Sequence, residues 1–516
     1  MTGPASQSRV HEEGEERAHD TARGPEEGEE RARLEGPEEG EERAHDAARV
    51  PEEGEERPHD AARVPEEGEE RARLEGLGVA QRLAEALRPF VGGDLPVRLR
   101  AWDGSEAGPA DAPLVELRSK DAIVRQLWHP GELGAAQSYV TGEIEVHHDL
   151  DDALTHVWAV AAERGLSGVR PSPTAFVRAL RTVLDVGALS RPPAPPASQA
   201  KLGRFGGGRL HSKLRDSRAI SHHYDLSNEF YSLILEPQMA YSSGYHTSDD
   251  PSYTVEDAQR DKLDLVCTKL GLSEGMRFLD IGCGWGSLSL HAAQHYGAQV
   301  TGVTIAAEQK KFIDARIAER GLQDQVEIRL QDYREIPEAQ GGARGSGDTR
   351  FDAVGSLEMG EHVGQKNYTS YARVLHDAVK PGGRVLIQQM SRGAGSQAGG
   401  RAGHPGGGPF IESFIAPDMH MRPVGETVAF LERGGLEVRD VHAMREHYVR
   451  TVAGWLENFE AHTDRLAELT SEEVVRVWRL YLVGGAMAFR DGRMGVDQIL
   501  MVRPGGAHTL PSVRTI

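Results

Sequence analysis

Between residues 276 and 389, short apolar runs alternate with longer segments whose apolar residues recur every three or four positions. Short apolar runs bounded by glycine or polar residues predict buried strands, and the helical spacing predicts helices. The predicted strands are Met276–Gly282, Gln299–Thr304, Val326–Leu330, Phe351–Ser356 and Arg384–Gln389, and the predicted helices are Leu288–Tyr296, Ala307–Arg320 and Tyr368–Val379. This alternation indicates an α/β fold with a Rossmann-like, doubly wound and mostly parallel sheet, which binds ligands beyond the carboxyl ends of its strands.

A smaller mixed domain is predicted ahead of this sheet, over residues 77–165. Val79–Phe90 has helical spacing, Pro96–Trp102 alternates like a strand, and Leu114–Leu127 and Leu150–Ala162 continue the domain. Residues 166–215 are predicted to form a linker, because proline and glycine clusters there prevent regular structure. One helix is expected inside the linker, at Thr174–Val186. The α/β domain then occupies residues 216–516.

The first 76 residues form a polar repeat in which Pro-Glu-Glu-Gly-Glu-Glu-Arg begins at Pro25, Pro37, Pro51 and Pro65. The 516-residue chain has a net charge of −21; this segment holds 25 acidic and 11 basic residues, a net of −14, which leaves −7 for the other 440 residues. The segment has almost no large apolar side chains, so burial cannot offset the entropy that the chain would lose on folding. We therefore expect a disordered acidic tail. The absence of a basic domain argues against nucleic acid as a partner.

The chain has two cysteines, Cys267 and Cys283, and shows neither an apolar leader nor an apolar run of membrane-spanning length. Two cysteines in so long a chain make no disulfide framework and suggest a reducing, cytoplasmic setting. We therefore expect a lipid substrate, if there is one, to be reached from the membrane surface.

The strongest local signal is the run Phe278-Leu-Asp-Ile-Gly-Cys-Gly-Trp-Gly286. An apolar strand enters a turn where Gly282 and Gly284 let the backbone approach a ligand, and a helix N-terminus follows. The spacing, with Asp280 just before the glycines, is typical of S-adenosylmethionine (SAM) methyltransferases rather than of the NAD fingerprint. The alternative is an ordinary tightly packed turn between a strand and a helix.

Residues after the next strands complete the predicted cofactor site. Thr304 and Gln309 can bond ribose hydroxyls, Asp332 can accept from the adenine amine, and Tyr333 can lie against the adenine ring. Tyr241 and Ser242 are expected to touch the methionine end of the cofactor. The alternative interpretations are that Thr304 and Gln309 are ordinary polar surface residues, and that Tyr241 and Ser242 belong to a packed loop.

Several motifs in one order closely resemble the cyclopropane-fatty-acyl-phospholipid synthase family, which includes the mycolic acid cyclopropane synthases. Besides the glycine run, the motifs are His222–Tyr231, Met239–Tyr245, Gly302–Ile305, Glu358–Gly364, Tyr368 and Lys380–Gly383, and the resemblance covers residues 77–504. It implies a small domain ahead of a SAM methyltransferase domain. It also implies an unsaturated phospholipid substrate in the membrane surface, and hence a cytoplasmic protein peripheral to the inner membrane face.

The resemblance also implies a mechanism. The methyl group adds to a cis double bond, leaves a carbocation on the acyl chain, and a bound bicarbonate then takes up a proton. By position, Glu361 and Tyr448 would hold the bicarbonate. At the position of a cysteine in the family this chain has Ser243, and at the position of a histidine it has Gln388. Serine and glutamine can hold an anion by hydrogen bonds, but they cannot supply a proton near neutral pH as histidine could. Glu358 is a candidate second carboxylate that stabilises positive charge.

With Ser243 and Gln388 at these two positions, the sequence resembles the branch of the family that makes methyl-branched chains of the tuberculostearic type. The expected product is then a 10-methylene acyl chain, which a separate reductase would convert to the 10-methyl chain, and a cyclopropane ring is the alternative. His222 and His223 lack partners at ligand spacing, so no metal is expected. The sequence leaves the oligomeric state open, with a homodimer among the alternatives.

An acyl tunnel could be lined by apolar residues that follow the last predicted strand, although ordinary core packing explains them equally well. These residues are Phe410–Ile415, Met419, Met421, Phe430 and Leu431. Two other functions are compatible with the cofactor motif: a methyltransferase for a soluble small molecule, and a lipid-binding protein without catalysis. The intact glycine run disfavours the second, and Glu361 with Tyr448 disfavours the first.

Overall fold

The computed structural model describes residues 76–166, 172–200, 226–340, 349–393 and 407–512. The acidic repeat, His222, His223 and parts of the predicted linker lie outside the described residues. Every described residue belongs to one compact unit of the chain. The predicted domain boundaries stay predictions.

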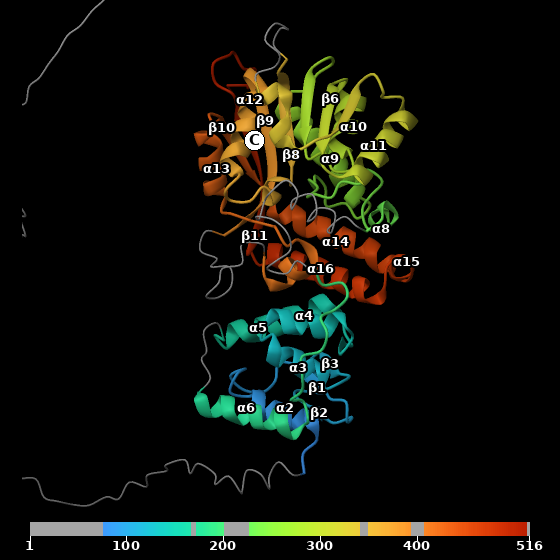
Figure 1. Ribbon diagram of the computed structural model, residues 1–516, viewed down its shortest axis with the longest axis vertical. Coiled ribbons are helices and arrows are strands. Elements are labelled where there is room, and N and C mark those ends of the chain that lie inside the picture. Colours follow the sequence, from blue (N-terminus) through green and yellow to red (C-terminus); the bar gives the residue numbers. More distant parts are fainter. Residues whose placement is uncertain (1–75, 167–171, 201–225, 341–348, 394–406, 513–516) are drawn as a thin grey trace, which may run out of the picture. The chain divides into compact units, whose positions relative to one another are not determined.

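A seven-stranded sheet forms the centre of the α/β region, with strand order β10-β11-β9-β8-β5-β6-β7 (Figure 1). The strands are β5 (Arg277–Ile281), β6 (Gln299–Thr304), β7 (Val326–Leu330), β8 (Phe351–Leu357), β9 (Val379–Arg392), β10 (Glu437–Ala443) and β11 (Met494–Val502). The strands β5 to β9 are parallel, and β10 and β11 join antiparallel. The order reverses between β5 and β8, so the predicted doubly wound sheet is confirmed.

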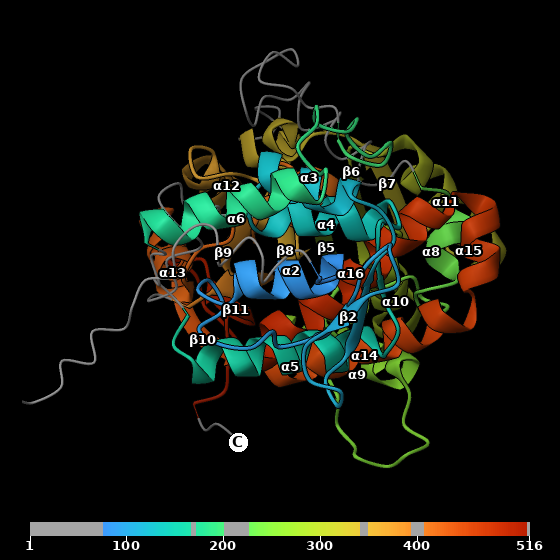
Figure 2. The same ribbon diagram turned by 90° about the horizontal axis from the view of Figure 1, so that it is seen from below.

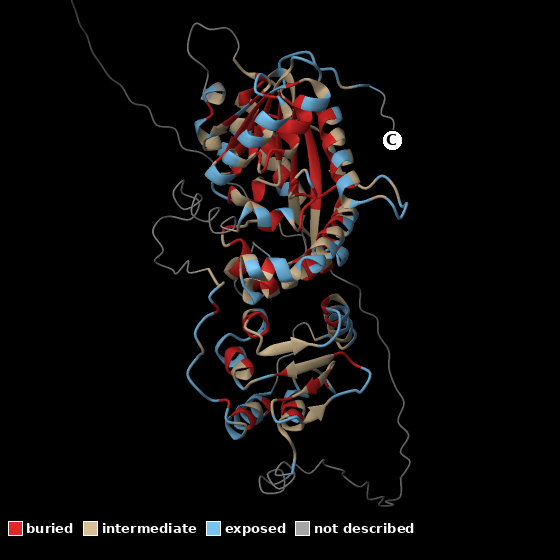
Figure 3. Ribbon diagram, turned by 90° about the vertical axis from the view of Figure 1, so that its right-hand side faces the viewer, coloured by how far each residue is buried: buried red, intermediate tan, exposed pale blue. Residues whose placement is uncertain are grey.

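Helices cover both faces of this sheet (Figure 1, Figure 2). They are α9 (Val255–Leu270), α10 (Ser287–Tyr296) and α11 (Ala307–Arg320) on one face, and α12 (Tyr368–Ala378) and α13 (Val424–Arg433) on the other. Phe278 packs under the first set and its neighbour Leu279 under the second, as alternating side chains of a strand require. Figure 3 shows the buried strands enclosed between partly exposed helices.

A second group of helices lies in the sequence between β10 and β11. It comprises α14 (Arg445–Ala461), α15 (Thr463–Leu469) and α16 (Glu472–Arg490), and the short α8 (Asn228–Ser232) packs with them. Their core is aromatic: the Trp478 ring lies 5.1 Å from the Phe230 ring and 5.6 Å from the Tyr231 ring. The sequence patterns used above did not predict these helices.

The region before residue 200 holds a four-stranded sheet of order β2-β1-β3-β4 with helices around it. The elements are α2 (Val79–Leu87), β1 (Arg98–Arg100), β2 (Glu106–Ala107), β3 (Leu114–Leu117), α3 (Asp121–Trp128), α4 (Glu132–Val140), β4 (Ile144–Val146), α5 (Leu150–Glu163) and α6 (Pro173–Asp185). The predicted helix to Phe90 ends early, at Leu87, because Pro89 has no backbone N–H to continue the helical hydrogen bonds. Within the described ranges no helix is long and apolar enough to cross a membrane.

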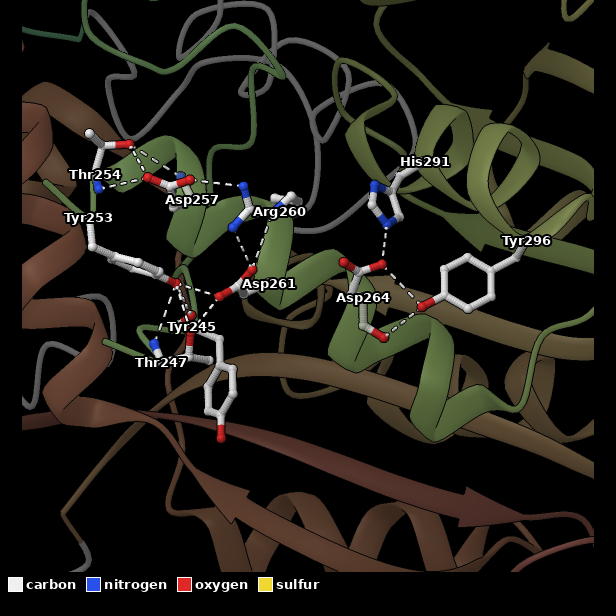
Figure 4. A network of polar contacts seen from close by, with 10 residues as sticks. All are labelled: Tyr245, Thr247, Tyr253, Thr254, Asp257, Arg260, Asp261, Asp264, His291 and Tyr296. Atoms are coloured by element: carbon white, nitrogen blue, oxygen red, sulfur yellow. Dashed lines mark hydrogen bonds and ion pairs between the residues drawn. The ribbon is translucent and has the colours of Figure 1, made fainter. Parts of the chain in front are cut away.

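The helix α9 begins with a reciprocal cap and carries a row of polar contacts (Figure 4). The backbone N–H of Asp257 donates to Thr254 Oγ1 at 3.3 Å, and the backbone N–H of Thr254 donates to the Asp257 carboxylate at 2.9 Å. Further along, Asp261 accepts from the Tyr253 hydroxyl at 2.7 Å. The cap therefore fixes where α9 starts, and with it the side chains that α9 directs toward the sheet.

We predict that Thr254→Ala lowers the free energy of unfolding by about 1 kcal/mol, because the backbone N–H of Asp257 loses its acceptor. Urea denaturation followed by circular dichroism measures this change. Thr254→Ser keeps the hydroxyl and is the matched control, with little expected effect. Equal stability of the alanine variant and the wild type would contradict the role of the cap.

Candidate functional site

The glycine turn between β5 and α10 forms one wall of a cavity at the carboxyl ends of the parallel strands. Gly282, Gly284 and Gly286 have φ values of 76°, 54° and 84°, a region that side chains other than glycine rarely adopt. A Cβ on Gly282 would come within 2.7 Å of Met359 Cγ. Glycine is therefore required here both by the backbone conformation and by the space.

All nine residues predicted to bind the cofactor line this one cavity. They are Tyr241, Ser242, Asp280, Gly282, Gly284, Thr304, Gln309, Asp332 and Tyr333. They come from separate parts of the chain, because the ends of neighbouring parallel strands meet at one edge of the sheet. Lining residues that the sequence analysis missed include Met239, Trp285, Arg334, Met359 and His362. Trp285 stands inside the glycine run, so that run already held a signal for it.

The polar lining residues are preorganised by one another. Asp280 is buried and accepts from Ser289 Oγ at 2.7 Å, and its burial raises the pKa of its carboxyl to about 6. Thr304 Oγ1 donates to Gln309 Oε1 at 3.0 Å. The Asp332 carboxylate is paired with the Arg334 guanidinium at 2.6 Å. Oxygen acceptors and hydroxyls held in this way suit a ligand with ribose hydroxyls and an amino-bearing base.

Three of the four predicted catalytic residues meet at Glu358. The backbone N–H of Ser243 and Nε2 of Gln388 donate to its Oε1 at 2.8 and 2.9 Å, and the Tyr448 hydroxyl donates to its Oε2 at 2.7 Å. Glu358 follows β8, lines the cavity, and has a φ of 49°. Such a conformation in a residue other than glycine is costly and is typically held by its surroundings at functional sites.

Glu361, the fourth predicted catalytic residue, lies behind this cluster rather than at its centre. It is 0% exposed, and its Oε1 accepts from the backbone N–H of Met390. Its Oε2 has no hydrogen-bond partner among the described residues, and Glu361 is not part of the cavity lining. Tyr448, which was expected to hold a bicarbonate together with Glu361, instead bonds Glu358. Ser243 contributes its backbone N–H, while its hydroxyl donates to the carbonyl of Gly244.

Electrostatics couple the two glutamates. Desolvation raises the pKa of Glu358, and the donors from Ser243, Tyr448 and Gln388 oppose that rise. Burial, and then the neighbouring negative charge of Glu358, raises the pKa of Glu361 to about 7. Because two close carboxylates in a dry environment resist joint ionisation, the pair holds a proton up to near-neutral pH.

A buried lysine on α9 balances this negative charge. Lys262 is 0% exposed, and its Nζ donates to Ser242 Oγ at 2.8 Å. Burial lowers the pKa of Lys262 to about 8, against the attraction of Glu358, Glu236 and Asp280. Lysine is usually a surface residue, so the sequence offered no signal for this role.

Aromatic rings flank the cavity on the side of α14 and α16. The Tyr241 ring lies 5.4 Å from the Trp455 ring, and its hydroxyl donates to the Tyr481 hydroxyl at 3.1 Å. Ring faces attract cations, and the apolar ring bodies exclude water. The site therefore combines a cation-attracting wall with a carboxylate.

The predicted tunnel residues separate into two groups. Phe410, Phe414, Ile415 and Met419 pack in the same cluster as Tyr448 and Trp455. Phe430 and Leu431 instead pack with α12 on the far face of the sheet, so including them was wrong. Their spacing, typical of a helix, serves to seat α13 on the sheet. Met421 is buried outside both clusters.

The comparisons with known proteins agree on one family. The family described as mycolic acid cyclopropane synthetase matches residues 211–499. A probable fatty acid methyltransferase of Pseudomonas putida is 36% identical, covering 81% of this chain and 95% of that protein. The tuberculostearic acid methyltransferase UfaA1 of Mycobacterium tuberculosis is 31% identical, covering 80% and 88%. A solved structure of mycolic acid cyclopropane synthase CmaA1 complexed with SAH and CTAB is 27% identical with a TM-score of 0.50, covering 55% of this chain and 98% of that one.

We predict that Gly282→Ala weakens SAM binding about tenfold or more, because its Cβ would displace Met359 at the cavity wall. Isothermal titration calorimetry measures the affinity. Gly275→Ala is the matched control, since Gly275 has a φ of 78° but nothing within 4 Å of its Cβ position. A SAM affinity of the Gly282 variant equal to that of the Gly275 variant and the wild type would contradict the need for glycine at the cavity wall.

Proposed function

Because the chain belongs to the mycolic acid cyclopropane synthetase family, we propose that it methylates the cis double bond of an unsaturated acyl chain in a membrane phospholipid. Family membership makes it a SAM-dependent methyltransferase. The observation that carries the proposal is the Glu358 carboxylate, fixed by three donors beside an apolar, aromatic wall. Methylation of an alkene requires such an apolar surrounding, whereas methylation of a soluble amine does not.

The cavity residues fit SAM. Gly282 and Gly284 leave room for its close approach, Thr304 and Gln309 offer polar atoms for the ribose, and Asp332 and Tyr333 line the cavity where the adenine would bind. When bound, SAM supplies an activated methyl group on a sulfonium. Tyr241 and Trp285, whose rings are 6.5 Å apart, lie at the cavity where that positive charge would be accommodated.

An alkene is a weak nucleophile, so the reaction requires orientation and the exclusion of water. The apolar cluster of Phe410, Phe414, Trp455 and Phe489 borders Tyr448 and supplies such a surrounding. The acyl chain would lie against this cluster with its double bond toward the cavity. Its polar head group would remain in contact with water.

Carbon–carbon bond formation leaves a positive charge on the acyl chain, which Glu358 is placed to stabilise. Glu358 is also the base that we assign to proton removal. The expected bicarbonate does not fit as a separate group, because the donors expected to hold it, at Ser243, Gln388 and Tyr448, already bond the Glu358 carboxylate. A carboxylate of the chain thus occupies the position of the anion, and no step passes through bicarbonate.

We assign a methylene-branched product. A hydride shift on the chain places the cation at the carbon that carries the new methyl group, and loss of a proton from that methyl to Glu358 gives a methylene (C=CH₂) branch on the chain. A relative that is named tuberculostearic acid methyltransferase supports this assignment. A reductase would then be the partner that saturates the methylene.

The proposal is tested by incubating the full chain with methyl-labelled SAM and vesicles of an oleoyl phospholipid. We expect label in the extracted acyl chains, with vinylidene proton resonances that identify the methylene and no ring resonances at high field. Label confined to a water-soluble product would contradict the proposed substrate. Ring-proton resonances at high field would support the proposed substrate but would show that the product is a cyclopropane and not the assigned methylene.

We predict that Glu358→Gln lowers kcat on the order of 10²–10⁴-fold while SAM affinity stays within about threefold, because a proton acceptor is lost without a change of shape. Single-turnover kinetics and calorimetry measure the two quantities. Glu437→Gln is the matched control, since Glu437 is exposed on β10 and, among the described residues, is paired with Arg439. A wild-type kcat in the Glu358 variant would remove that residue from the mechanism.

The two raised pKa values predict a pH profile. Below about pH 7 Glu361 holds the proton of the pair, and above it both carboxylates are ionised. The second negative charge strengthens Glu358 as a base and stabilises the cation, so kcat/KM should rise as pH increases through about 7. In Glu361→Gln this second charge cannot form, and the rise should be lost. A rise that persists in this variant would contradict the coupling.

A further inference from the structure

We propose that an exposed apolar face on α6 and the end of α3 docks this chain on an anionic lipid bilayer. The proposed function supplies only the reason for such docking, which is to bring the enzyme to a substrate that lies in a membrane. The face belongs to the small domain and shares no residue with the cavity of the methyltransferase site.

Exposed large hydrophobic side chains are concentrated in one part of the described chain. Nine of the eleven lie between residues 76 and 200, and four of these are on α6. Phe176, Val177, Leu180 and Leu184 are 63%, 48%, 39% and 49% exposed. Single exposed hydrophobic residues are ordinary, but a cluster on one short helix marks an interaction surface.

The spacing on α6 places these side chains on one face. Phe176, Leu180 and Leu184 follow at intervals of four residues, and Val177 lies beside them. The other side of α6 is already seated, because Val183 packs with Val124 of α3. A helix that already packs against its domain through one side normally carries polar residues on the opposite, solvent-facing side. The exposed apolar stripe on α6 therefore needs another explanation.

The end of α3 lies beside the segment that follows α6. Leu127 and Trp128 are 37% and 53% exposed, and Leu189, which follows α6, is 56% exposed. The indole N–H of Trp128 donates to the carbonyl of Ser190 at 3.1 Å, which holds the ring next to Leu189. An indole with an apolar body and one polar edge is favoured at the boundary between lipid and water.

Charge favours an anionic lipid as the occupant. Arg178 and Arg181 are exposed on α6, and residues 173–200 hold three Arg against one Asp, in a chain of net charge −21. Basic residues beside an amphipathic helix are attracted to anionic head groups. A second copy of this chain is disfavoured, because a symmetric dimer through this face would bring like charges together.

The test is co-sedimentation of the full chain with phosphatidylglycerol vesicles, without SAM. We expect the triple variant Phe176→Ser, Leu180→Ser and Leu184→Ser to bind at least about tenfold more weakly than the wild type, since each loses apolar area that lipid would bury. Val441→Ser is the matched control, because Val441 is 44% exposed on β10, outside the face. Wild-type binding should also fall at high salt and on pure phosphatidylcholine.

Equal vesicle binding by the triple variant and the wild type, with both folded by circular dichroism, would overturn the proposal. Light scattering that shows a wild-type dimer and a monomeric triple variant, with vesicle binding unchanged, would assign the face to a second copy and overturn it as well. Activity on detergent-dispersed phospholipid separates the two proposals. If the wild type binds vesicles through this face but labels no acyl chain, the proposed function fails and the docking face stands.

Discussion

The carboxylate of Glu358 joins three segments that are far apart in the sequence. It accepts from the loop at Ser243, from Gln388 on β9 and from Tyr448 on α14, all within 2.9 Å. A carboxylate can remain charged away from bulk water only when donors satisfy its oxygens. The helices that enclose the cavity are thereby fixed to the sheet at the point where the chemistry takes place.

Charge balance explains the rest of the site. The proposed reaction passes through positive charge, so a cavity wall with Glu358, Asp280 and aromatic rings stabilises what forms there. Uncompensated buried acids would destabilise the fold, and Lys262 offsets them from α9. Glu361 keeps one oxygen unpartnered among the described residues, consistent with its holding a proton near neutral pH.

The central sheet could be predicted from the sequence because its strands and helices are strongly periodic: β6, α11 and β7 have the predicted bounds. The cofactor residues could be predicted because they follow strand ends, which the topology brings together. The identity of the central carboxylate could not be predicted. Glu358 and Glu361 differ by three residues, and only the left-handed backbone at Glu358 and the tertiary approach of α14 decide which one meets Tyr448.

The most direct test of this account is the dependence of the rate on bicarbonate. Methyl transfer to an oleoyl phospholipid would be followed in buffer freed of carbon dioxide, with and without added bicarbonate. With Glu358 in the place of the anion, we predict equal rates in the two conditions. A rate that collapses without bicarbonate and recovers on its addition would contradict the assignment of Glu358 as the base.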